Sequence, residues 1–405
     1  MQARRILSFL FLAFWASAGI RAQQAAGAQA PAKRMVRGVV FDDANGNGRR
    51  DAGEAGVAGA AVSDQFAVVR AGVDGGYELA ADATARVVFV SVPDGWAASG
   101  VFWRALQSDA ATQQHDFAVR RIPNTREFTF VHASDTHLDQ ASLPRIQKLR
   151  ALVEQQKPAF VLITGDLIRD ALRVGEAPAR AQYDLLVAEL AKFPVPVWTV
   201  PGNHEIFGIE RHLSLVPTTH PLYGKKMYQH YLGPNYFSFN YGGVHFVGLD
   251  TVDVNDLWYY GHVDKAQLGW LERDLAALPQ RTPVVTFNHI PFSSSVENLY
   301  GYTDEPPAGS TIRIGGRMQF RHVVSNPAEV IAVIRKQHFL EIALGGHFHT
   351  RETVAYESQG QRLRFYQTAA VLGNSPVPGL TMISGVTLYQ VRSGKVDEGK
   401  FLPLD

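Results

Sequence analysis

The feature that most constrains the fold is the hydrophobic pattern that begins near residue 127. Beyond it, short apolar runs alternate with segments of helical periodicity, as is typical of layered α/β folds. The runs that we expect to form strands are Phe128–Ala133, Phe160–Thr164, Val197–Val200, Val244–Leu249, Val284–Phe287 and Leu340–Leu344. The expected helices are Leu143–Gln156, Ala179–Lys192, Asp264–Leu278 and Ala328–Gln337. The sequence therefore predicts an α/β domain over residues 127–405.

Residues 34–120 have a different pattern, in which short β-prone runs are separated by glycines and helical periodicity is absent. The expected strands are Val36–Phe41, Ala60–Ser63, Phe66–Arg70, Tyr77–Leu79, Val87–Val92 and His115–Val119. Short strands at regular spacing are typical of a small all-β sandwich, which we predict over residues 34–120. Pro123 and Asn124 lie in the segment Arg120–Arg126, which we expect to be a hinge between the two domains.

The N-terminus resembles a secretory signal peptide. Arg4 and Arg5 precede the apolar run Ile6–Ala18, and an Ala-rich exit with Arg21 and Ala22 follows it. A membrane anchor is the alternative, but a span needs about 20 apolar residues and this run is shorter. We therefore expect a signal peptide over residues 1–22, an Ala/Gln-rich linker over residues 23–33, and no transmembrane segment after removal of the signal.

Composition limits the chemistry of any active site. The chain has no cysteine, so thiol catalysis and thiolate metal ligands are excluded and a metal site must use His, Asp, Glu and Asn. The formal net charge of +1 argues against broad binding to extended nucleic acid. The export signal and the lack of cysteine together predict a bacterial protein that is periplasmic or secreted.

Polar side chains able to bind metals follow five of the expected strands. They are Asp135, His137, Asp166, Asn203, His289, His347 and His349. In open α/β sheets the ligand site lies at the carboxyl ends of the strands, so we expect these side chains to converge. In extended backbone, residues i and i+2 point to the same side, which predicts that Asp135 and His137 face one cluster, as do His347 and His349. Glycines at 165, 202, 345 and 346 permit close backbone approach beside the ions.

Each of these motifs alone is weak, because a strand-end Asp is more often a turn residue or a helix cap. Their conjunction, each after a strand, favours a metal site. This ligand set suits Zn, Fe or Mn, and two ions that share a carboxylate are the arrangement expected of a two-metal hydrolase.

The segment from Phe128 to Val386 resembles the calcineurin-like metallophosphoesterase superfamily. It carries Asp-x-His, Gly-Asp, Gly-Asn-His-Glu, Asn-His and Gly-His-x-His in the order of that family. The resemblance is to bacterial exported members with an N-terminal β-sandwich accessory domain. It implies a two-sheet αββα sandwich for the catalytic domain. It also implies one ion held by Asp135, His137, Asp166 and His349, and a second held by Asp166, Asn203, His289 and His347.

The resemblance gives His204 a role other than metal binding. In the family, the histidine of Gly-Asn-His-Glu donates a proton to the leaving oxygen or stabilises the transferring phosphoryl group, and an imidazole suits this role because it titrates near neutral pH. An Asp shortly after Gly-Asp often orients this histidine. Here Asp170 follows Asp166 by four residues, so we name Asp170 as its expected partner.

These features predict a metal-dependent phosphoesterase in which a hydroxide bridging two ions attacks phosphorus. We expect a small-molecule, lipid or nucleotide phosphoester as substrate, with a phosphodiester favoured over a monoester. A phosphomonoesterase of the nucleotidase type is the main alternative. A metal-stabilised surface protein without catalysis is a third, which the complete ligand set disfavours.

A second metal site is expected near the N-terminus. The segment from Asp43 to Glu54 fits the oxygen-ligand spacing of a twelve-residue calcium loop. Its candidate ligands for structural calcium are Asp43, Asn45, Asn47, Arg49, Asp51 and Glu54. The flanks are not helical, so the alternative is a polar turn between strands.

The segment Pro291–Arg321 is long and rich in Gly, Pro and Ser. A loop of this length beside a site is often a lid, and Arg313, Arg317 and Arg321 could bind the distal part of an anionic substrate. The alternative for each arginine is solvated surface charge.

Overall fold

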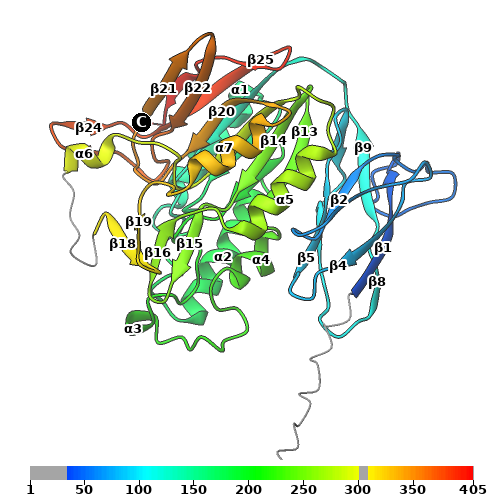
Figure 1. The fold of residues 1–405 in the computed structure, drawn as a ribbon, viewed down its shortest axis with the longest axis horizontal. Coiled ribbons are helices and arrows are strands. Elements are labelled where there is room, and N and C mark those ends of the chain that lie inside the picture. The colour runs from blue at the N-terminus through cyan, green and yellow to red at the C-terminus, as the bar shows by residue number, and fades with distance from the viewer. Residues whose placement is uncertain (1–33, 301–308, 405) are drawn as a thin grey trace, which may run out of the picture. The chain divides into compact units, whose positions relative to one another are not determined.

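The computed structural model describes residues 34–300 and 309–404 (Figure 1). The predicted signal peptide and linker lie outside these residues, as does part of the predicted lid. From Lys33 onward the chain forms one compact unit. Within the described residues, no helix combines the length and the apolar character needed to cross a membrane.

The predicted all-β sandwich is confirmed and consists of two sheets. The first has the order β4 (Gly76–Ala81), β1 (Arg34–Asp42), β9 (Phe117–Arg121) and β6 (Trp96–Ala98), with β8 (Thr112–Gln114) also paired to β1. The second has the order β3 (Val68–Arg70), β2 (Ala61–Ser63), β5 (Val87–Ser91) and β7 (Trp103–Ala105). We call these residues the accessory domain. Strands β6, β7 and β8 were not predicted, because all of their side chains except that of Gln113 are half-buried or exposed and no apolar run marks them.

Two six-stranded sheets form the centre of the catalytic part. The order of the first is β12 (Val197–Val200), β11 (Val161–Thr164), β10 (Glu127–Ala133), β25 (Gly385–Arg392) and β26 (Lys395–Val396), with β27 (Lys400–Pro403) paired to β25. The order of the second is β13 (Phe237–Tyr241), β14 (Val244–Leu249), β17 (Pro283–Asn288), β20 (Phe339–Gly345), β22 (Gln361–Gln367) and β21 (Glu352–Ser358). Three hairpins lie outside them: β15 (Val252–Asn255) with β16 (Trp258–Gly261), β18 (Thr311–Ile314) with β19 (Arg317–Phe320), and β23 (Ser375–Val377) with β24 (Leu380–Met382).

The helices are α1 (Leu143–Gln156), α2 (Glu176–Leu190), α3 (Arg211–Ser214), α4 (Lys226–Leu232), α5 (Lys265–Ala276), α6 (Val296–Tyr300) and α7 (Pro327–Arg335). Helices α5 and α7 lie side by side against the second sheet (Figure 1). Helix α2 begins three residues earlier than predicted, because Pro178 stands in its first turn, where the missing N–H needs no partner.

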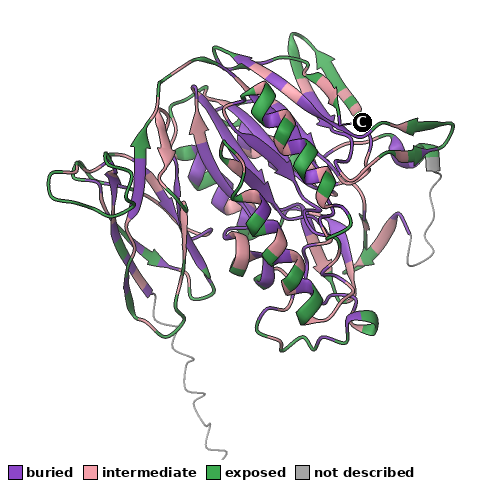
Figure 2. Cartoon of the chain, turned by 180° about the vertical axis from the view of Figure 1, so that it is seen from behind, coloured by how far each residue is buried: buried purple, intermediate pink, exposed green. Residues whose placement is uncertain are grey.

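Alternation along the strands builds the layers. The ring of Phe130 in β10 lies 5.6 Å from that of Phe246 in the second sheet, so it fills the space between the sheets. The next residue, Val131, belongs instead to a core shared with Ile146 and Leu149 of α1. The buried strands therefore lie between helical layers (Figure 2), and the predicted αββα sandwich is confirmed.

Strand direction places the functional side chains. Strands β10, β11 and β12 are parallel to one another in the first sheet. Strands β14, β17 and β20 are likewise parallel in the second. The carboxyl ends of each set therefore meet at one edge of their sheet, and the loops that follow them carry the predicted metal ligands.

The accessory domain packs directly on the catalytic part. The indole of Trp270 in α5 donates a hydrogen bond to Ser63 Oγ (3.1 Å), and Gln65 donates to the backbone oxygen of Tyr236 (2.9 Å). Ser91 and Ser238 are joined by their hydroxyls at 2.8 Å. One hydrophobic core includes residues of both parts, and the domain boundary at residues 120–127 stays a prediction.

Candidate metal centre

The structure brings all seven predicted metal-binding side chains to one place. Asp135 and His137 follow β10, Asp166 follows β11 and Asn203 follows β12, all in the first sheet. The second sheet contributes His289 after β17 and His347 and His349 after β20. All of these except His347 and His349 are buried, and those two are partly buried.

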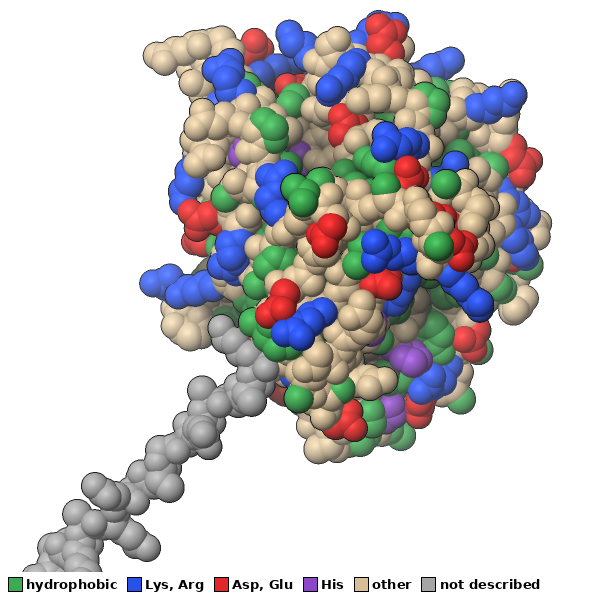
Figure 3. Space-filling view, turned by 90° about the vertical axis from the view of Figure 1, so that its right-hand side faces the viewer, with side chains coloured by type: hydrophobic (Ala, Val, Ile, Leu, Met, Phe, Trp, Pro, Cys, Tyr) green, Lys and Arg blue, Asp and Glu red, His purple; other side chains and the backbone are tan. Residues whose placement is uncertain are grey.

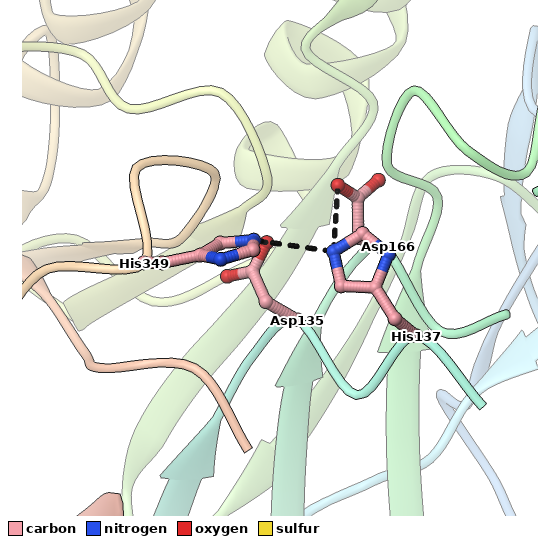
Figure 4. Close-up of side chains that lie close together, drawn as sticks. All are labelled: Asp135, His137, Asp166 and His349. Atoms are coloured by element: carbon pink, nitrogen blue, oxygen red, sulfur yellow. Dashed lines mark hydrogen bonds and ion pairs between the residues drawn. The ribbon is translucent and has the colours of Figure 1, made fainter. Parts of the chain in front are cut away.

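The side chains form two groups with one member in common. In the first group, ligand atoms of Asp135, His137, Asp166 and His349 all lie within 4.8 Å of one another (Figure 4). In the second group the same holds for Asp166, His289 and His347. Asn203 completes the second group, because its Oδ1 is 3.1 Å from His289 Nε2. Asp166 thus stands between two sets of ligands.

The prediction from extended backbone, in which residues i and i+2 face one side, is wrong, because the paired residues are not in extended backbone. Asp135 has φ 54° and His137 has φ 39°, and His347 and His349 have φ 78° and 55°. Left-handed backbone is costly for residues other than glycine, and such strain is concentrated at functional sites. The His347 and His349 side chains reach different groups, so their pair does not face a single cluster.

Two of the predicted glycines are required by close approach. A Cβ on Gly202 would lie 2.2 Å from Asp166 Oδ1, so any side chain there would displace this carboxylate. Gly165 has φ +81°, and a Cβ on it would lie 2.7 Å from the His289 side chain. Glycine is therefore needed at these two positions, because Asp166 and His289 leave no room for a Cβ.

Two carboxylates and four imidazoles are crowded together in the site. Asp135 Oδ1 is buried, and its contact with the ring of His349, at 3.3 Å from Nε2, does not meet hydrogen-bond geometry. The Nε2 atoms of His137 and His349 face each other at 3.1 Å, and dashed lines in Figure 4 join His137 to His349 and to Asp166. A buried carboxylate oxygen without a well-formed hydrogen bond is costly unless a cation offsets it. The residues present therefore fit metal ions.

Electrostatics favour positive charge at the same place. Burial alone would raise the pKa of Asp166, but the neighbouring rings of His289 and His204 hold this pKa well below its usual value. Burial disfavours a charged His289, yet Asp166 and Asp135 raise the pKa of this ring to about 9. The carboxylates thus attract a cation into a buried site.

His204 lies beside these groups at the cavity. Its backbone N–H donates to Asp166 Oδ1 (3.0 Å), and its Nε2 lies 3.9 Å from Asp166 Oδ2. Its Nδ1 is 2.7 Å from the backbone oxygen of Arg169. A proton on Nδ1 therefore donates to that oxygen, and Nε2 is directed to the site.

The structure gives His204 a different partner from the predicted Asp170. The Asp170 carboxylate accepts from the backbone N–H of Leu172 (2.8 Å) and forms an ion pair with Arg173 (3.2 Å). It lines the same cavity, but both of these partners lie in its own loop, which they stabilise. A backbone oxygen takes the orienting position, and a sequence motif does not show such a partner.

Two residues that contact the ligands or the loops that carry them were not predicted to belong to the site. Glu205 is buried, and its carboxylate accepts from the backbone N–H groups of Leu167 (2.7 Å) and Gly202 (2.6 Å), which ties the loop after β11 to the loop after β12. Its place in the Gly-Asn-His-Glu motif was the available signal. His322, whose Nδ1 lies 2.8 Å from His347 Nε2, stands in no motif.

A cavity of about 410 Å³ opens onto the centre. Beside the predicted ligands it is lined by His204, Arg169, Asp170, Arg173, Tyr259 and Leu372. Arg321 of the predicted lid is buried, with its guanidinium 5.0 Å from the Tyr259 ring. Arg313 donates to the backbone oxygen of Gly316 at 3.2 Å. A substrate-binding role for Arg313, Arg317 and Arg321 stays a prediction.

The candidate calcium loop is held by its own hydrogen bonds. Asn45 and Asn47 both donate to Asp51 Oδ2 at 2.7 Å, and the backbone N–H of Gly48 donates to Asp43 Oδ2 at 3.0 Å. Glu54 accepts from the backbone N–H of Ala44 at 3.1 Å. These bonds are those of a polar turn, and calcium binding, with Arg49 at the seventh position of the loop and Asp51 at the ninth, stays a prediction.

Comparison with known proteins identifies the family. A family model described as calcineurin-like phosphoesterase matches residues 128–351, and a model of the N-terminal domain of calcineurin-like phosphoesterases matches residues 44–122. The chain belongs to the calcineurin-like phosphoesterase family and is a phosphoester hydrolase with a candidate site for metal ions.

Solved structures of low identity also resemble the chain. A dimetal phosphatase from Danio rerio is 15% identical with a TM-score of 0.42, over 69% of this chain and 99% of that one. GAP50, the anchor in the inner membrane complex of Plasmodium, is 12% identical with a TM-score of 0.43, over 69% of this chain and 85% of that one. No curated protein matches the chain.

Proposed function

We propose that the protein hydrolyses a small phosphate ester, a phosphodiester in preference to a monoester, at a binuclear metal centre. The observation that carries this proposal is the position of Asp166, whose carboxylate belongs to both ligand groups. Asp135, His137, Asp166 and His349 would hold one ion, and Asp166, Asn203, His289 and His347 the other. Mn, Zn or Fe suits this set of imidazole, carboxylate and amide oxygen.

The protein side chains would divide the work of hydrolysis. Bound ions would supply a water of lowered pKa and neutralise charge on the phosphoryl oxygens. His204 would donate a proton from Nε2 to the leaving oxygen, while the Arg169 backbone oxygen keeps its Nδ1–H in place. Asp166 would orient the same residue through its backbone N–H.

The cavity supports a substrate larger than phosphate alone. A volume of about 410 Å³ lies in the range of small-molecule sites. On the face shown in Figure 3, Lys and Arg side chains are interspersed with Asp and Glu, without the basic stripe that a polyanion would require. A lipid headgroup or nucleotide diester fits these features.

A monoester is the second candidate, and Arg169 is the observation that favours it. Its side chain is exposed and lines the cavity beside His204. A guanidinium there would bind the additional negative charge that a monoester carries.

The test uses the chain from Gln23, stripped of metal and reloaded separately with Mn, Zn or Fe. Hydrolysis of a generic phosphodiester and a generic phosphomonoester is then measured side by side. Faster metal-dependent turnover of the diester supports the proposal, and turnover of the monoester alone replaces it with the second candidate. No turnover of either with both ions bound would favour a binding protein.

We also propose that the protein is exported to the periplasm or the medium of a bacterium. The apolar run Ile6–Ala18 after Arg4 and Arg5 supports this location. The mass of the protein recovered from the producing cell tests it, because loss of residues 1–22 is expected and retention of Met1 would contradict export.

A further inference from the structure

His347 is the one residue of the second ligand group whose two ring nitrogens both face other histidines. Its Nδ1 lies 3.1 Å from His289 Nε2, on the side of the metal centre. Its Nε2 lies 2.8 Å from Nδ1 of His322, on the opposite side. The planes of the His322 and His347 rings are inclined by only 21° and their centroids lie 5.1 Å apart, so with the short contact between their nitrogens the two rings lie edge to edge.

His289 shows how the other imidazole of this group is held. Its Nδ1 is 2.8 Å from the backbone oxygen of Thr164, which accepts only, so Nδ1 carries a proton and Nε2 is the nitrogen that can bind metal. Histidines that bind metals almost always donate their second N–H to such an acceptor. For His347, the group in that position is the side chain of His322.

His322 is itself fixed by the residues around it. It follows β19, and its neighbour Arg321 has its backbone N–H bonded to Ser310 at 2.9 Å. Two residues later, Val324 donates its backbone N–H to the oxygen of Pro291 at 2.9 Å. The Tyr259 ring packs edge-on at 6.0 Å. A ring held in this way can impose an orientation on His347.

We propose that His322 is a positioning residue for the second metal ion, which it serves by accepting the Nε2–H of His347. A neutral imidazole has one N–H. When that proton resides on Nε2 of His347 and is bonded to His322 Nδ1, the lone pair of His347 resides on Nδ1 and is directed at the centre. His322 then carries its own proton on Nε2. This inference rests on the proposed two-metal site. It adds the segment after β19 to the parts of the chain that orient the ligands of that site.

The test compares two variants of nearly equal size, His322→Asn and His322→Leu. Both remove the ring, but only Asn retains an acceptor oxygen near the position of Nδ1. Binding of Mn or Zn to metal-free protein is measured by isothermal titration calorimetry, with His230→Phe, at an exposed histidine, as the control. We expect His322→Leu to weaken the binding of one of the two ions by about 10- to 100-fold. His322→Asn should recover most of that lost affinity, and the control should bind metal as the wild type does.

Equal weakening in the Asn and Leu variants would overturn the inference, because the ring would then serve packing alone. Wild-type affinity in the Leu variant would overturn it as well. Should either variant not fold, ¹⁵N NMR of the zinc-loaded wild type decides the question: His347 protonated on Nε2 supports the inference, and protonated on Nδ1 refutes it. These readouts do not depend on turnover, so a protein that binds two ions but hydrolyses no ester would refute the proposed function and leave this test valid.

Discussion

At the scale of single residues, hydrogen bonds decide what each imidazole of the centre can do. His289 and His204 both have Nδ1 against a backbone oxygen, that of Thr164 in one case and that of Arg169 in the other. Each therefore directs Nε2 at the site. His289 lies among the ligands, 3.3 Å from Asp166, whereas His204 Nε2 is 3.9 Å from that carboxylate and borders the cavity. The same ring is thus suited to metal binding in one place and to proton donation in the other.

The His204→Ala variant should separate these two roles. Because His204 is not among the proposed ligands, the variant should bind two ions as the wild type does, while kcat falls by about 10²- to 10⁴-fold through loss of the proton donor. Elemental analysis and steady-state hydrolysis of the preferred ester measure the two effects. Turnover equal to that of the wild type would refute the proton-donor assignment.

At the scale of elements, buried polar side chains join loops that are distant in sequence. Glu205, in the loop after β12, accepts the N–H groups of Leu167 and Ile168 in the loop after β11, at 2.7 and 3.1 Å. Its other oxygen accepts from Gly202 at 2.6 Å. The loops that carry Asp166 and Asn203 therefore form one unit.

Glu205→Gln should loosen that unit without changing its shape. The amide retains one acceptor oxygen and turns an NH₂ group toward a buried N–H, so the free energy of unfolding should fall by about 1–3 kcal/mol. The affinity for metal should fall with it. Urea unfolding and metal titration measure both, with Glu272→Gln as the control, since Glu272 is an exposed partner of Lys336. Unchanged stability and affinity would contradict the role assigned to Glu205.

The β15–β16 hairpin gives a prediction that depends on pH. Burial opposes ionisation of Asp253, but hydrogen bonds from His262 and Tyr260 and the charge of Lys225 lower its pKa to about 2. The pKa in the unfolded chain is about 3.9, so the folded value is the lower one. Ionised Asp253 therefore stabilises the fold above about pH 4, by at most about 3 kcal/mol, and this contribution is lost as the pH falls toward 2. The stability difference between wild type and Asp253→Asn, from urea unfolding, should shrink over that range. A stability difference that does not change with pH would contradict the stabilising role of ionised Asp253.

At the scale of the whole molecule, the accessory domain and the catalytic part share one core. Trp270 of α5 is fully buried, with its ring 6.4 Å from that of Phe89 in β5 and 5.0 Å from that of Tyr236. The accessory domain is therefore part of the folding unit, and the segment Arg120–Arg126, predicted as a hinge, joins parts that are packed together.

Trp270→Ala should destabilise both parts at once. Removal of a buried indole costs about 3–5 kcal/mol. Because the core is continuous, calorimetry should show one unfolding transition, shifted to a lower temperature. The exposed Val73, replaced by Ala, is the control and should unfold as the wild type does. Two separate transitions, with that of the accessory domain unchanged, would contradict a shared core.

Much of this fold could be predicted, because its central strands are apolar and its motifs stand at strand ends. The predicted ranges of β12, β14 and α1 agree with the structure residue for residue. The edge strand β21 was not predicted, since most of its side chains are exposed and show no apolar pattern. The predicted ligands could be found because residue type and position after a strand are both visible in the sequence. The partners of His204 and His347 could not be predicted. Arg169 acts through its backbone oxygen, and His322 lies 25 residues from His347 in the chain.

The number of metal ions bound per chain, in the wild type and in Asp166→Asn, decides whether the centre is binuclear. In the proposed centre one carboxylate serves two ions. We expect two ions per wild-type chain, and loss of both metal occupancy and hydrolysis in the variant. A variant that retains two tightly bound ions would contradict the bridging position of Asp166, and a wild-type chain that hydrolyses esters with no metal bound would contradict the binuclear mechanism as a whole.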